Sequence, residues 1–318
     1  MKKLTDAKID TSTRVFVRLD LDVPIKDGAV QDNSRIKAAI PTLKYLRDHG
    51  AQIVIAGHMG RPKNNDPKLS TSQLKPLFDK MFKDYPYTLL ENLRYDAREE
   101  TDSHEYAREL VGTCNMYVNE SFATSHRAHT SIVAIPKLIP GYAGINFQKE
   151  VENINKVLQN PERPLTALVG GAKIDSKKPV IKKFLKVCDH VLVGGKIGFD
   201  WDEDTPANLH LPKDYEEDKK DIGMQTVIYF SEIIKRSKTI VWAGPMGLFE
   251  QQMFAKGTQL IAEAVIASGA YSIIGGGDTA SAIDNFGLTE KFSFVSTGGG
   301  ALLELIINGT LPGIEAIS

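Results

Sequence analysis

The stretch KFSFVSTGGGALLE, residues 291–304, decides how the rest of the chain is interpreted. An apolar, β-branched and aromatic run precedes three glycines and a segment of helix formers, which predicts a strand, a tight turn and a helix. Such a turn exposes backbone N–H groups at the positive end of the helix, where phosphate and other anions bind. The glycines Gly298, Gly299 and Gly300 therefore mark a candidate anion site.

The same pattern occurs twice more in the second half of the chain. In YSIIGGGDTASAI, residues 271–283, a predicted strand ends in three glycines, and in LTALVGGAKIDSK, residues 165–177, it ends in two. Strand ends of this kind, repeated in one half of a chain, indicate a polyphosphate site. Lys173 and Lys177 are four residues apart, so on a helix both amines reach the same phosphates.

Composition limits the class of protein. With 318 residues, of which 42% are hydrophobic, the chain is long enough for two domains. A net charge of -1 provides no overall attraction to nucleic acid or to acidic membranes. Two cysteines do not form a disulfide scaffold, and the N-terminal residues lack the apolar run of a signal peptide. We therefore expect a soluble, cytoplasmic protein that binds neither nucleic acid nor membranes.

The first half alternates strands and helices at the spacing of βαβ units. Strands are predicted at 14–21, 51–58, 87–93 and 116–121, with helices at 34–50, 74–82 and 98–112 between them. The strand at 51–58 is apolar at nearly every position, which indicates a parallel sheet covered on both faces. Doubly wound sheets of this kind bind ligands beyond the carboxyl ends of their strands.

Basic side chains follow these strand ends. They are Arg18, Arg35, Arg61, Arg94 and Arg127, together with His58, His126 and His129. A single arginine is commonly solvated or paired with an acid, but five at equivalent places in a repeating unit predict an anion pocket, because the guanidinium group grips carboxylate and phosphate with two N–H bonds. Each histidine, taken alone, fits a structural role as well as a ligand contact.

The second half follows a predicted helix at 147–158 and the linking segment QNPERP, residues 159–164. Its strands are predicted at 165–171, 190–195, 238–245, 271–277 and 291–297, with a polar surface excursion at 200–222. The predicted fold class is α/β, with two doubly wound parallel-sheet, Rossmann-like lobes at 1–150 and 151–304.

Asp278, directly after a glycine turn, has two interpretations. Its carboxylate fits a Mg²⁺ ion whose other ligands come from nucleotide phosphates. It fits equally well as the cap of the helix that follows, because aspartate is a favoured N-cap residue.

Other nucleotide-binding motifs are absent or incomplete. The sequence contains no GxxxxGK[ST] motif and no HRD or DFG set, which argues against P-loop and protein-kinase machinery. GGGDTA satisfies the dinucleotide pattern G-x-G-x-x-A, which also requires an acidic residue at the end of the next strand. That strand ends in Ser296 and Thr297 instead, which disfavours NAD binding.

With these residues in view, the chain resembles the phosphoglycerate kinases along nearly its whole length. The resemblance is carried by ordered runs, namely VFVRLDLDVP (15–24), SRIKAAIPTLKYL (34–46), GHMGRPK (57–63), LLENLRY (89–95), YVNESFATSHRAHTS (117–131), QNPERP, GGAKIDSK (170–177), KTIVWAGPMGLFE (238–250), GGGDTASA (275–282), FVSTGGGALLE (294–304) and LPGIEAI (311–317).

The resemblance implies two lobes that face a cleft and are joined by a helical hinge. Residues 1–150 would bind phosphoglycerate, residues 151–304 the nucleotide, and residues 305–318 would pack back on the first lobe. The implied reaction is reversible phosphoryl transfer between 1,3-bisphosphoglycerate and ADP, giving 3-phosphoglycerate and ATP in glycolysis or gluconeogenesis. It is implied to be a direct, in-line transfer by a monomer that uses Mg²⁺.

The resemblance also implies roles for individual residues. The phosphoglycerate ligands would be Asp20, Asp22, Arg35, His58, Arg61, Arg94 and Arg127. The nucleotide would be bound by Gly170, Gly171, Lys173, Lys177, Pro245, Gly247, Leu248, Glu250, Gly275, Gly276, Gly277, Asp278 and Thr279. Catalysis would involve Arg35, Lys177, Gly298 and Gly299, and Asp278 would hold Mg²⁺ with the phosphates.

The chain departs from the family pattern at several positions. Asp22 and Ala243 stand where the family has asparagine, Lys196 and Ile197 alter its GGGM motif, and Met224 replaces a proline. Stretches 63–86 and 200–222 are shorter than in the family. A non-catalytic sensor with the same fold is the alternative function, favoured by Asp22 and Ala243, whereas Arg35, Lys177 and Asp278 favour an enzyme.

Overall fold

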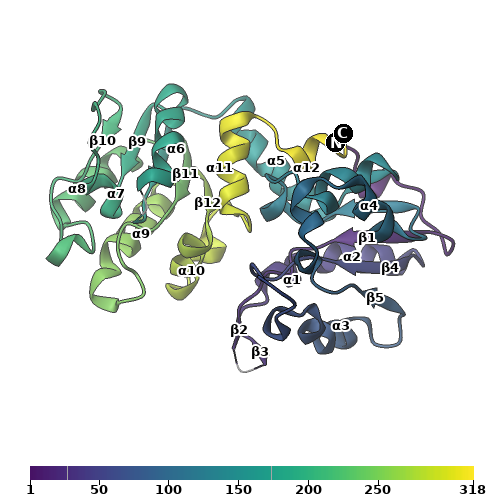
Figure 1. Cartoon of the computed structure of the whole chain (residues 1–318). Helices are drawn as coiled ribbons and strands as arrows, with labels where there is room; N and C mark the ends of the chain where they lie inside the picture. The colour runs from purple at the N-terminus through teal and green to yellow at the C-terminus, as the bar shows by residue number, and fades with distance from the viewer. Residues whose placement is uncertain (27, 173) are drawn as a thin grey trace. The chain divides into compact units, whose positions relative to one another are not determined.

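The computed structural model describes residues 1–26, 28–172 and 174–318, and the chain divides into two compact units (Figure 1). Unit 1 comprises Met1–Glu152 and Thr310–Ser318, and unit 2 comprises Asn153–Gly309. Each unit contains one parallel sheet, with five strands in unit 1 and six in unit 2. The predicted fold class, α/β with two doubly wound parallel sheets, is confirmed.

The sheet of unit 1 has the order β5-β4-β1-β6-β7, and its neighbouring strands pair in parallel. These strands are β5 (Tyr87–Leu89), β4 (Gln52–Ala56), β1 (Arg14–Arg18), β6 (Met116–Asn119) and β7 (Gly141–Ala143). A small antiparallel hairpin joins β2 (Ile25–Lys26) to β3 (Ala29–Val30). Strand β1 is central and buried along most of its length, as its apolar run predicts.

Two predicted helices of unit 1 are interrupted in the structure. The helix expected at 34–50 forms α1 (Ser34–Ala38) and α2 (Ile40–Asp48), because Pro41 lacks the N–H that would continue the hydrogen-bond ladder. The helix expected at 98–112 begins as the 3₁₀ turn η5 (Ala97–Thr101). After Asp102, at φ 51°, Ser103 caps α4 (His104–Val111).

The remaining helices of unit 1 close its core. Helix α3 (Lys75–Phe82) packs Phe78 and Phe82 against the sheet. The linking helix α5 (Ile145–Gln159) begins where the buried carboxylate of Glu120 accepts hydrogen bonds from the backbone N–H groups of residues 146 and 147. Burial raises the pKa of Glu120 to about 7.

The C-terminal segment belongs to unit 1. Helix α11 (Gly299–Asn308) lies wholly in unit 2, so the return begins at Thr310 and not at residue 305. Helix α12 (Pro312–Glu315) follows, and the N–H of Gly313 donates to the carbonyl of Ser125 at 2.9 Å. Both chain ends therefore lie together, with the N–H of Lys2 donating to the carbonyl of Ile317 at 3.0 Å (Figure 1).

The sheet of unit 2 has the order β10-β9-β8-β11-β12-β13, again with parallel pairing. Its strands are β8 (Leu165–Val169), β9 (His190–Val193), β10 (Leu209–His210), β11 (Thr239–Ala243), β12 (Tyr271–Gly275) and β13 (Phe294–Val295). Its helices are α6 (Ile174–Val187), α7 (Gly195–Phe199), α8 (Met224–Ile234), α9 (Lys256–Ser268), α10 (Gly277–Asn285) and α11.

The polar stretch at 200–222 is more than the surface excursion that its composition predicts. It contributes the edge strand β10 to the sheet, and its next-to-last residue, Asp221, is only 1% exposed. The Asp221 carboxylate accepts hydrogen bonds from the N–H groups of Ile222 and Gly257. The polar composition concealed the contact with Gly257, because the two residues are 36 positions apart in sequence. Among the described residues, no helix combines the length and apolar character needed to cross a membrane.

In both sheets the strand order reverses beside the first strand, between β1 and β6 in unit 1 and between β8 and β11 in unit 2. Ligands of doubly wound proteins bind at the carboxyl ends of the strands at this point. In unit 2 the two chain segments there touch, because a Cβ atom added to Gly170 would lie 2.1 Å from the carbonyl oxygen of Pro245. Gly170 is therefore required by close backbone approach.

We predict that Gly170→Ala destabilises unit 2 by about 1–3 kcal/mol, because the new methyl group overlaps backbone that cannot rotate away. Chemical denaturation of the wild type and the variant measures this difference. Gly277→Ala is the matched control, since its added Cβ meets nothing within 4 Å. Equal stabilities of the Gly170→Ala variant and the wild type would contradict the close packing of these strand ends.

Candidate functional site

The centre of the candidate site in unit 1 is Arg18, the last residue of β1, whose side chain is fully buried. Its Nε donates to Ser131 Oγ at 2.8 Å, and one terminal nitrogen donates to the backbone carbonyl of Leu19. The other terminal nitrogen lies 3.0 Å from His58 Nδ1. A buried guanidinium needs such partners, and here they fix its plane at the carboxyl edge of the sheet.

A buried carboxylate, that of Glu99, holds Ser131, the hydrogen-bond partner of Arg18. Glu99, in η5, accepts hydrogen bonds from Ser131 Oγ at 2.6 Å and from the Ser131 N–H at 3.1 Å. Burial raises the pKa of Glu99, while the positive charge of Arg18 opposes that shift. Ser131 thus links Arg18 to Glu99 and holds η5 against the sheet.

Two histidines beside the arginines are kept neutral. Burial lowers the pKa of His129 to about 3, and the positive charges of Arg94, Arg18 and Arg127 act in the same direction. The pKa of His58 is also well below its usual range, again chiefly because of burial. Neutral rings leave the guanidinium groups as the charged donors of the site.

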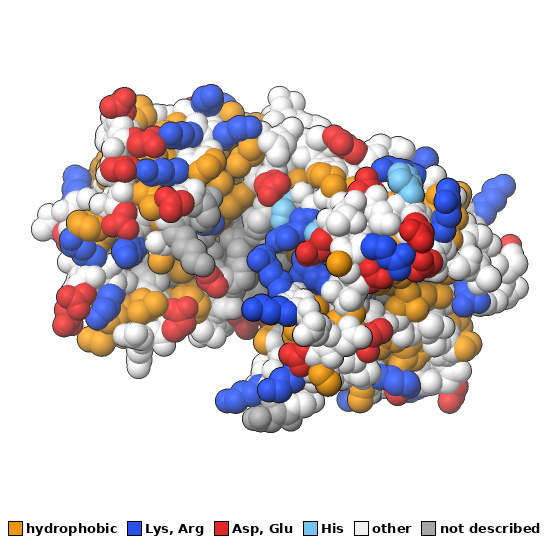
Figure 2. Space-filling model, viewed as in Figure 1, with side chains coloured by type: hydrophobic (Ala, Val, Ile, Leu, Met, Phe, Trp, Pro, Cys, Tyr) orange, Lys and Arg blue, Asp and Glu red, His pale blue; other side chains and the backbone are white. Residues whose placement is uncertain are grey.

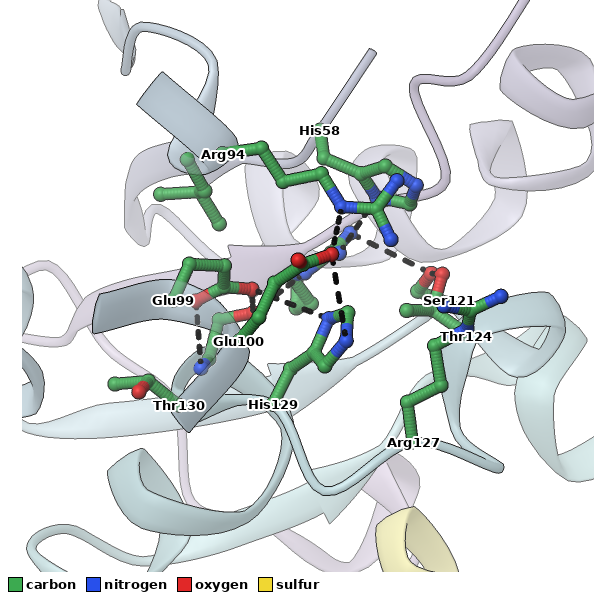
Figure 3. Close-up of polar contacts among 12 residues, drawn as sticks. His58, Arg94, Glu99, Glu100, Ser121, Thr124, Arg127, His129 and Thr130 are labelled. Carbon is green, nitrogen blue, oxygen red and sulfur yellow. Dashed lines mark hydrogen bonds and ion pairs between the residues drawn. The ribbon is translucent and has the colours of Figure 1, made fainter. Parts of the chain in front are cut away.

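Arg94 lies beside His58 and His129, and its side chain is only 6% exposed. Its Nη1 donates to the carbonyl of Gly60 at 2.7 Å, and its Nε lies 2.9 Å from Glu100 Oε1. Figure 3 shows His58, Arg94 and His129 directed toward one region, with the carboxylate of Glu100 between Arg94 and His129.

Arg127 completes the basic cluster, which we define as Arg18, His58, Arg94, Arg127 and His129. Arg127 Nε lies 3.2 Å from His126 Nε2. On the face of unit 1 that Figure 2 shows, Lys and Arg side chains gather beside histidines. Strand ends from four different parts of the chain thus converge, as the parallel topology requires.

The other predicted residues of unit 1 form a second group. Arg35 Nη1 lies 3.3 Å from Asp20 and donates to the backbone carbonyl of Asp22 at 3.1 Å. Burial raises the pKa of Asp20, against the opposing charges of Arg35 and Arg18. Asp22 Oδ1 accepts a hydrogen bond from the Gly60 N–H at 2.8 Å, a role that an asparagine oxygen also fills. Arg61 is exposed.

In unit 2 the backbone segments at the glycine turns contact one another. The N–H groups of Gly170 and Gly171 donate to the carbonyls of Ala243 and Pro245 at 3.1 and 2.9 Å. A Cβ atom on Gly299 would lie 2.2 Å from the Cα of Gly276, so the turns that begin α10 and α11 also touch. Thr279, in α10, connects these turns to the segment after β11, because its Oγ1 accepts a hydrogen bond from the Gly244 N–H at 2.7 Å.

Two charged groups of unit 2 influence one another. Burial lowers the pKa of Lys177 in α6, while the negative charge of Asp278 at the start of α10 opposes that shift. Lys173, the other predicted lysine, lies outside the described residues. Asp278 is exposed and is the second residue of α10, whose N-cap is Gly276, so the interpretation of Asp278 as the cap of this helix is wrong.

The loop after β11 carries the remaining predicted residues. Pro245 is buried, and the N–H of Gly247 donates to Thr258 Oγ1 at 3.2 Å. The N–H of Leu248 donates to the carbonyl of Lys220 at 2.8 Å, while the Leu248 side chain is 39% exposed. Glu250 is exposed, and none of the described hydrogen bonds joins it to the glycine turns.

Glu99, Glu100 and Ser131 are the functional candidates that the sequence did not reveal. Glu99 and Ser131 are 32 residues apart, and although Ser131 ends the run at 117–131 that carries the resemblance, the resemblance assigned it no role. Their only signal was proximity in sequence to Arg94 and His129. Arg18 was recognised as one of the basic residues, but its burial was not.

Each of the two parallel sheets carries basic side chains or glycine turns at its carboxyl edge, and this arrangement is that of a doubly wound α/β protein. The family model described as phosphoglycerate kinase matches residues 4–88, 79–201 and 207–309. The chain therefore belongs to the phosphoglycerate kinase family. This confirms the resemblance and the enzyme class inferred from the sequence.

Individual relatives agree with this assignment. The chain is 36% identical to the phosphoglycerate kinase of Finegoldia magna, over 99% of this chain and 98% of that protein. It is also 36% identical to the Dictyoglomus turgidum phosphoglycerate kinase, over 96% and 95% of the two chains. The first alignment extends over 392 positions, more than the 318 residues of this chain, so the relative has segments that this chain lacks.

Solved structures show the same architecture. The phosphoglycerate kinase structure from Coxiella burnetii superposes with a TM-score of 0.86 at 29% identity, covering 99% of this chain and 98% of that one. The structure from Pyrococcus horikoshii also gives 0.86, at 27% identity, covering 100% and 98%. The shortened chain therefore retains the family fold.

We predict that the neutral state of His129 makes unit 1 less stable in acid. Its pKa is depressed in the folded state, so protons bind preferentially to the unfolded chain as the pH falls below about 6.5. Relative to His129→Gln, the wild type should lose about 2 kcal/mol more of its unfolding free energy between pH 7 and pH 5.

Chemical denaturation at both pH values measures this difference. His104→Gln is the control, because His104 is exposed and lies outside the basic cluster. An identical pH dependence for the wild type and His129→Gln would show that His129 is not held neutral.

Proposed function

We propose that the chain transfers a phosphoryl group reversibly between 1,3-bisphosphoglycerate and ADP, giving 3-phosphoglycerate and ATP. Family membership supports the reaction. The observation that carries the proposal is the basic cluster, where buried guanidinium groups and neutral histidines meet at the carboxyl edge of one sheet. Such a site fits a small ligand that carries both phosphate and carboxylate.

In this proposal, phosphoglycerate binds to unit 1 through two groups of residues. His58, Arg94 and Arg127 supply donors to its non-transferring phosphate, because they lie at the convergent strand ends. Arg35, held by Asp20 and by the backbone of Asp22, faces the carboxyl group that gives or receives the phosphoryl group. Arg61, which is exposed, joins the ligand as it binds.

The nucleotide binds to unit 2 in this proposal. The turns at Gly275, Gly276 and Gly277 and at Gly298, Gly299 and Gly300 supply N–H groups to its phosphates, since each begins a helix of at least nine residues. Lys177 adds positive charge from α6, and Lys173, which lies outside the described residues, is assigned the same role by the resemblance. Gly170, Gly171, Pro245, Gly247, Leu248 and Glu250 surround the nucleoside, and Thr279 holds two of these turns together.

The chemical step is an in-line displacement. The bond between phosphorus and the acyl oxygen of 1,3-bisphosphoglycerate breaks while a terminal oxygen of ADP forms a new bond to the same phosphorus. No proton transfer and no covalent enzyme intermediate are needed. The protein aligns the two oxygens and neutralises the equatorial oxygens through Arg35, Lys177 and the amides of Gly298 and Gly299.

The residues of unit 2 fit a magnesium ion that arrives with the nucleotide. Among the described residues no cluster of three or more His, Cys, Asp or Glu side chains could hold a metal. Asp278 offers one exposed carboxylate beside a helix start, which suits an ion whose other ligands are phosphate oxygens and waters. Bound there, Mg²⁺ would offset phosphate charge.

The test of this proposal is ATP formation from 1,3-bisphosphoglycerate and MgADP, followed with a coupled assay. Steady turnover by the wild-type chain is expected. Binding of 3-phosphoglycerate and ADP without any turnover would instead identify a non-catalytic sensor, the alternative that Ala243 and Asp22 favour.

We predict that Lys177→Met and Arg35→Met each lower kcat by about 10²- to 10³-fold, because each removes a cation placed at developing negative charge. The dissociation constants of the single substrates should change much less, since each substrate keeps its other ligands. Steady-state kinetics and calorimetric titration measure the two effects separately.

Lys182→Met is the matched control, because this α6 lysine pairs with Glu203 at 2.8 Å and is half exposed. Its kcat should equal that of the wild type. Parallel losses of affinity and turnover in the Lys177 or Arg35 variants would remove these residues from the catalytic role.

A further inference from the structure

A carboxylate of the chain itself lies against the basic cluster. Glu100 Oε1 is 2.9 Å from Arg94 Nε and 3.9 Å from His129 Nε2 (Figure 3). These nitrogens belong to the side chains that the proposed function assigns to, or places beside, an anionic ligand. The Glu100 carboxylate therefore lies at the position beside Arg94 where a phosphate or carboxylate group of the substrate would bind.

The Glu100–Arg94 contact is short, but the Glu100 side chain is free to leave it. The side chain of Glu100 is 52% exposed, whereas that of Arg94 is 6% exposed. Among the described residues, Arg94 Nε is buried without a hydrogen-bond partner, so the approach of Glu100 is an ion pair and not an aligned hydrogen bond. Because the Glu100 carboxylate reaches solvent, it can exchange Arg94 for water, and an ion pair with such an exposed partner contributes little net stability.

The two neighbouring glutamates have different tasks. Glu99 is fully buried and is fixed by two hydrogen bonds from Ser131, so the turn η5 stays in place. Glu100 can consequently leave Arg94 by side-chain rotation alone. Arg94 does not depend on Glu100 for its orientation, because its Nη1 also donates to the Gly60 carbonyl.

We infer that Glu100 is an internal carboxylate that holds the place of the anionic ligand on Arg94 and moves into solvent when phosphoglycerate binds. The inference rests on the proposed function, because it takes the basic cluster as the phosphoglycerate site. Glu100 thereby lowers the affinity for every anion at this site and favours ligands whose several charged groups can displace it. It is a residue that sets specificity and takes no part in the chemical step.

The test compares anion binding by the wild type and Glu100→Gln. Calorimetric titration with 3-phosphoglycerate, and separately with inorganic phosphate, should give a dissociation constant about two- to fivefold lower for the variant, because one competing charge has been removed. The KM for 3-phosphoglycerate should fall by a similar factor while kcat is unchanged. Added salt should reduce the difference.

Two control variants isolate the cause. Glu105→Gln removes the same charge from an exposed neighbour that lies 3.9 Å from Arg98, and its affinity should match the wild type. Glu100→Asp keeps the charge but shortens the side chain, and its affinity should lie between those of the wild type and Glu100→Gln.

An unchanged or weaker affinity in Glu100→Gln would overturn the inference and would identify Glu100 as a support for Arg94. An equal gain in Glu105→Gln would overturn it too, because the effect would then be one of net charge. Failure to bind either anion in both proteins would also overturn it. The proposed function is judged separately, by turnover of the wild type, so the two failures are distinguishable.

Discussion

The burial of Arg18 at the end of β1 is the constraint on which unit 1 depends. A guanidinium enclosed by protein must find partners for its N–H groups, and here they come from Ser131, His58 and the Leu19 carbonyl. Ser131 in turn holds Glu99, and Glu99 holds the turn that carries Glu100. One satisfied buried charge therefore sets the positions of the strand ends around the basic cluster. The same charge helps keep the neighbouring histidines neutral.

In unit 2 the strand ends at the candidate site are held by close backbone contact. Its strand ends approach so closely that Gly170 and Gly299 leave no space for a Cβ atom. Close approach brings the N-termini of α10 and α11 to neighbouring places at one edge of the sheet. Helix starts present unpaired N–H groups, which suit the repeated negative charge of a polyphosphate. A rigid guanidinium site and a backbone amide site thus suit two chemically different anions.

The sequence predicted much of this arrangement, and the reasons for its failures are physical. Apolar runs that end in glycine predicted the strands of both sheets, and the arginines after strand ends predicted the basic cluster. The break in the helix at 34–50 depended on Pro41, whose effect on a helix varies with its position. The pairing of Glu99 with Ser131, and of Asp221 with Gly257, depended on tertiary contacts between distant residues. No local pattern reports such contacts, and so these residues were missed.

The central claim is that the basic cluster of unit 1 binds phosphoglycerate. A crystal structure of the full chain with 3-phosphoglycerate tests it most directly. The account predicts ligand density at the carboxyl edge of the sheet, within hydrogen-bond distance of the guanidinium groups of Arg94 and Arg127. Density on any other surface, with these groups still turned toward Glu100 and His126, would contradict the account.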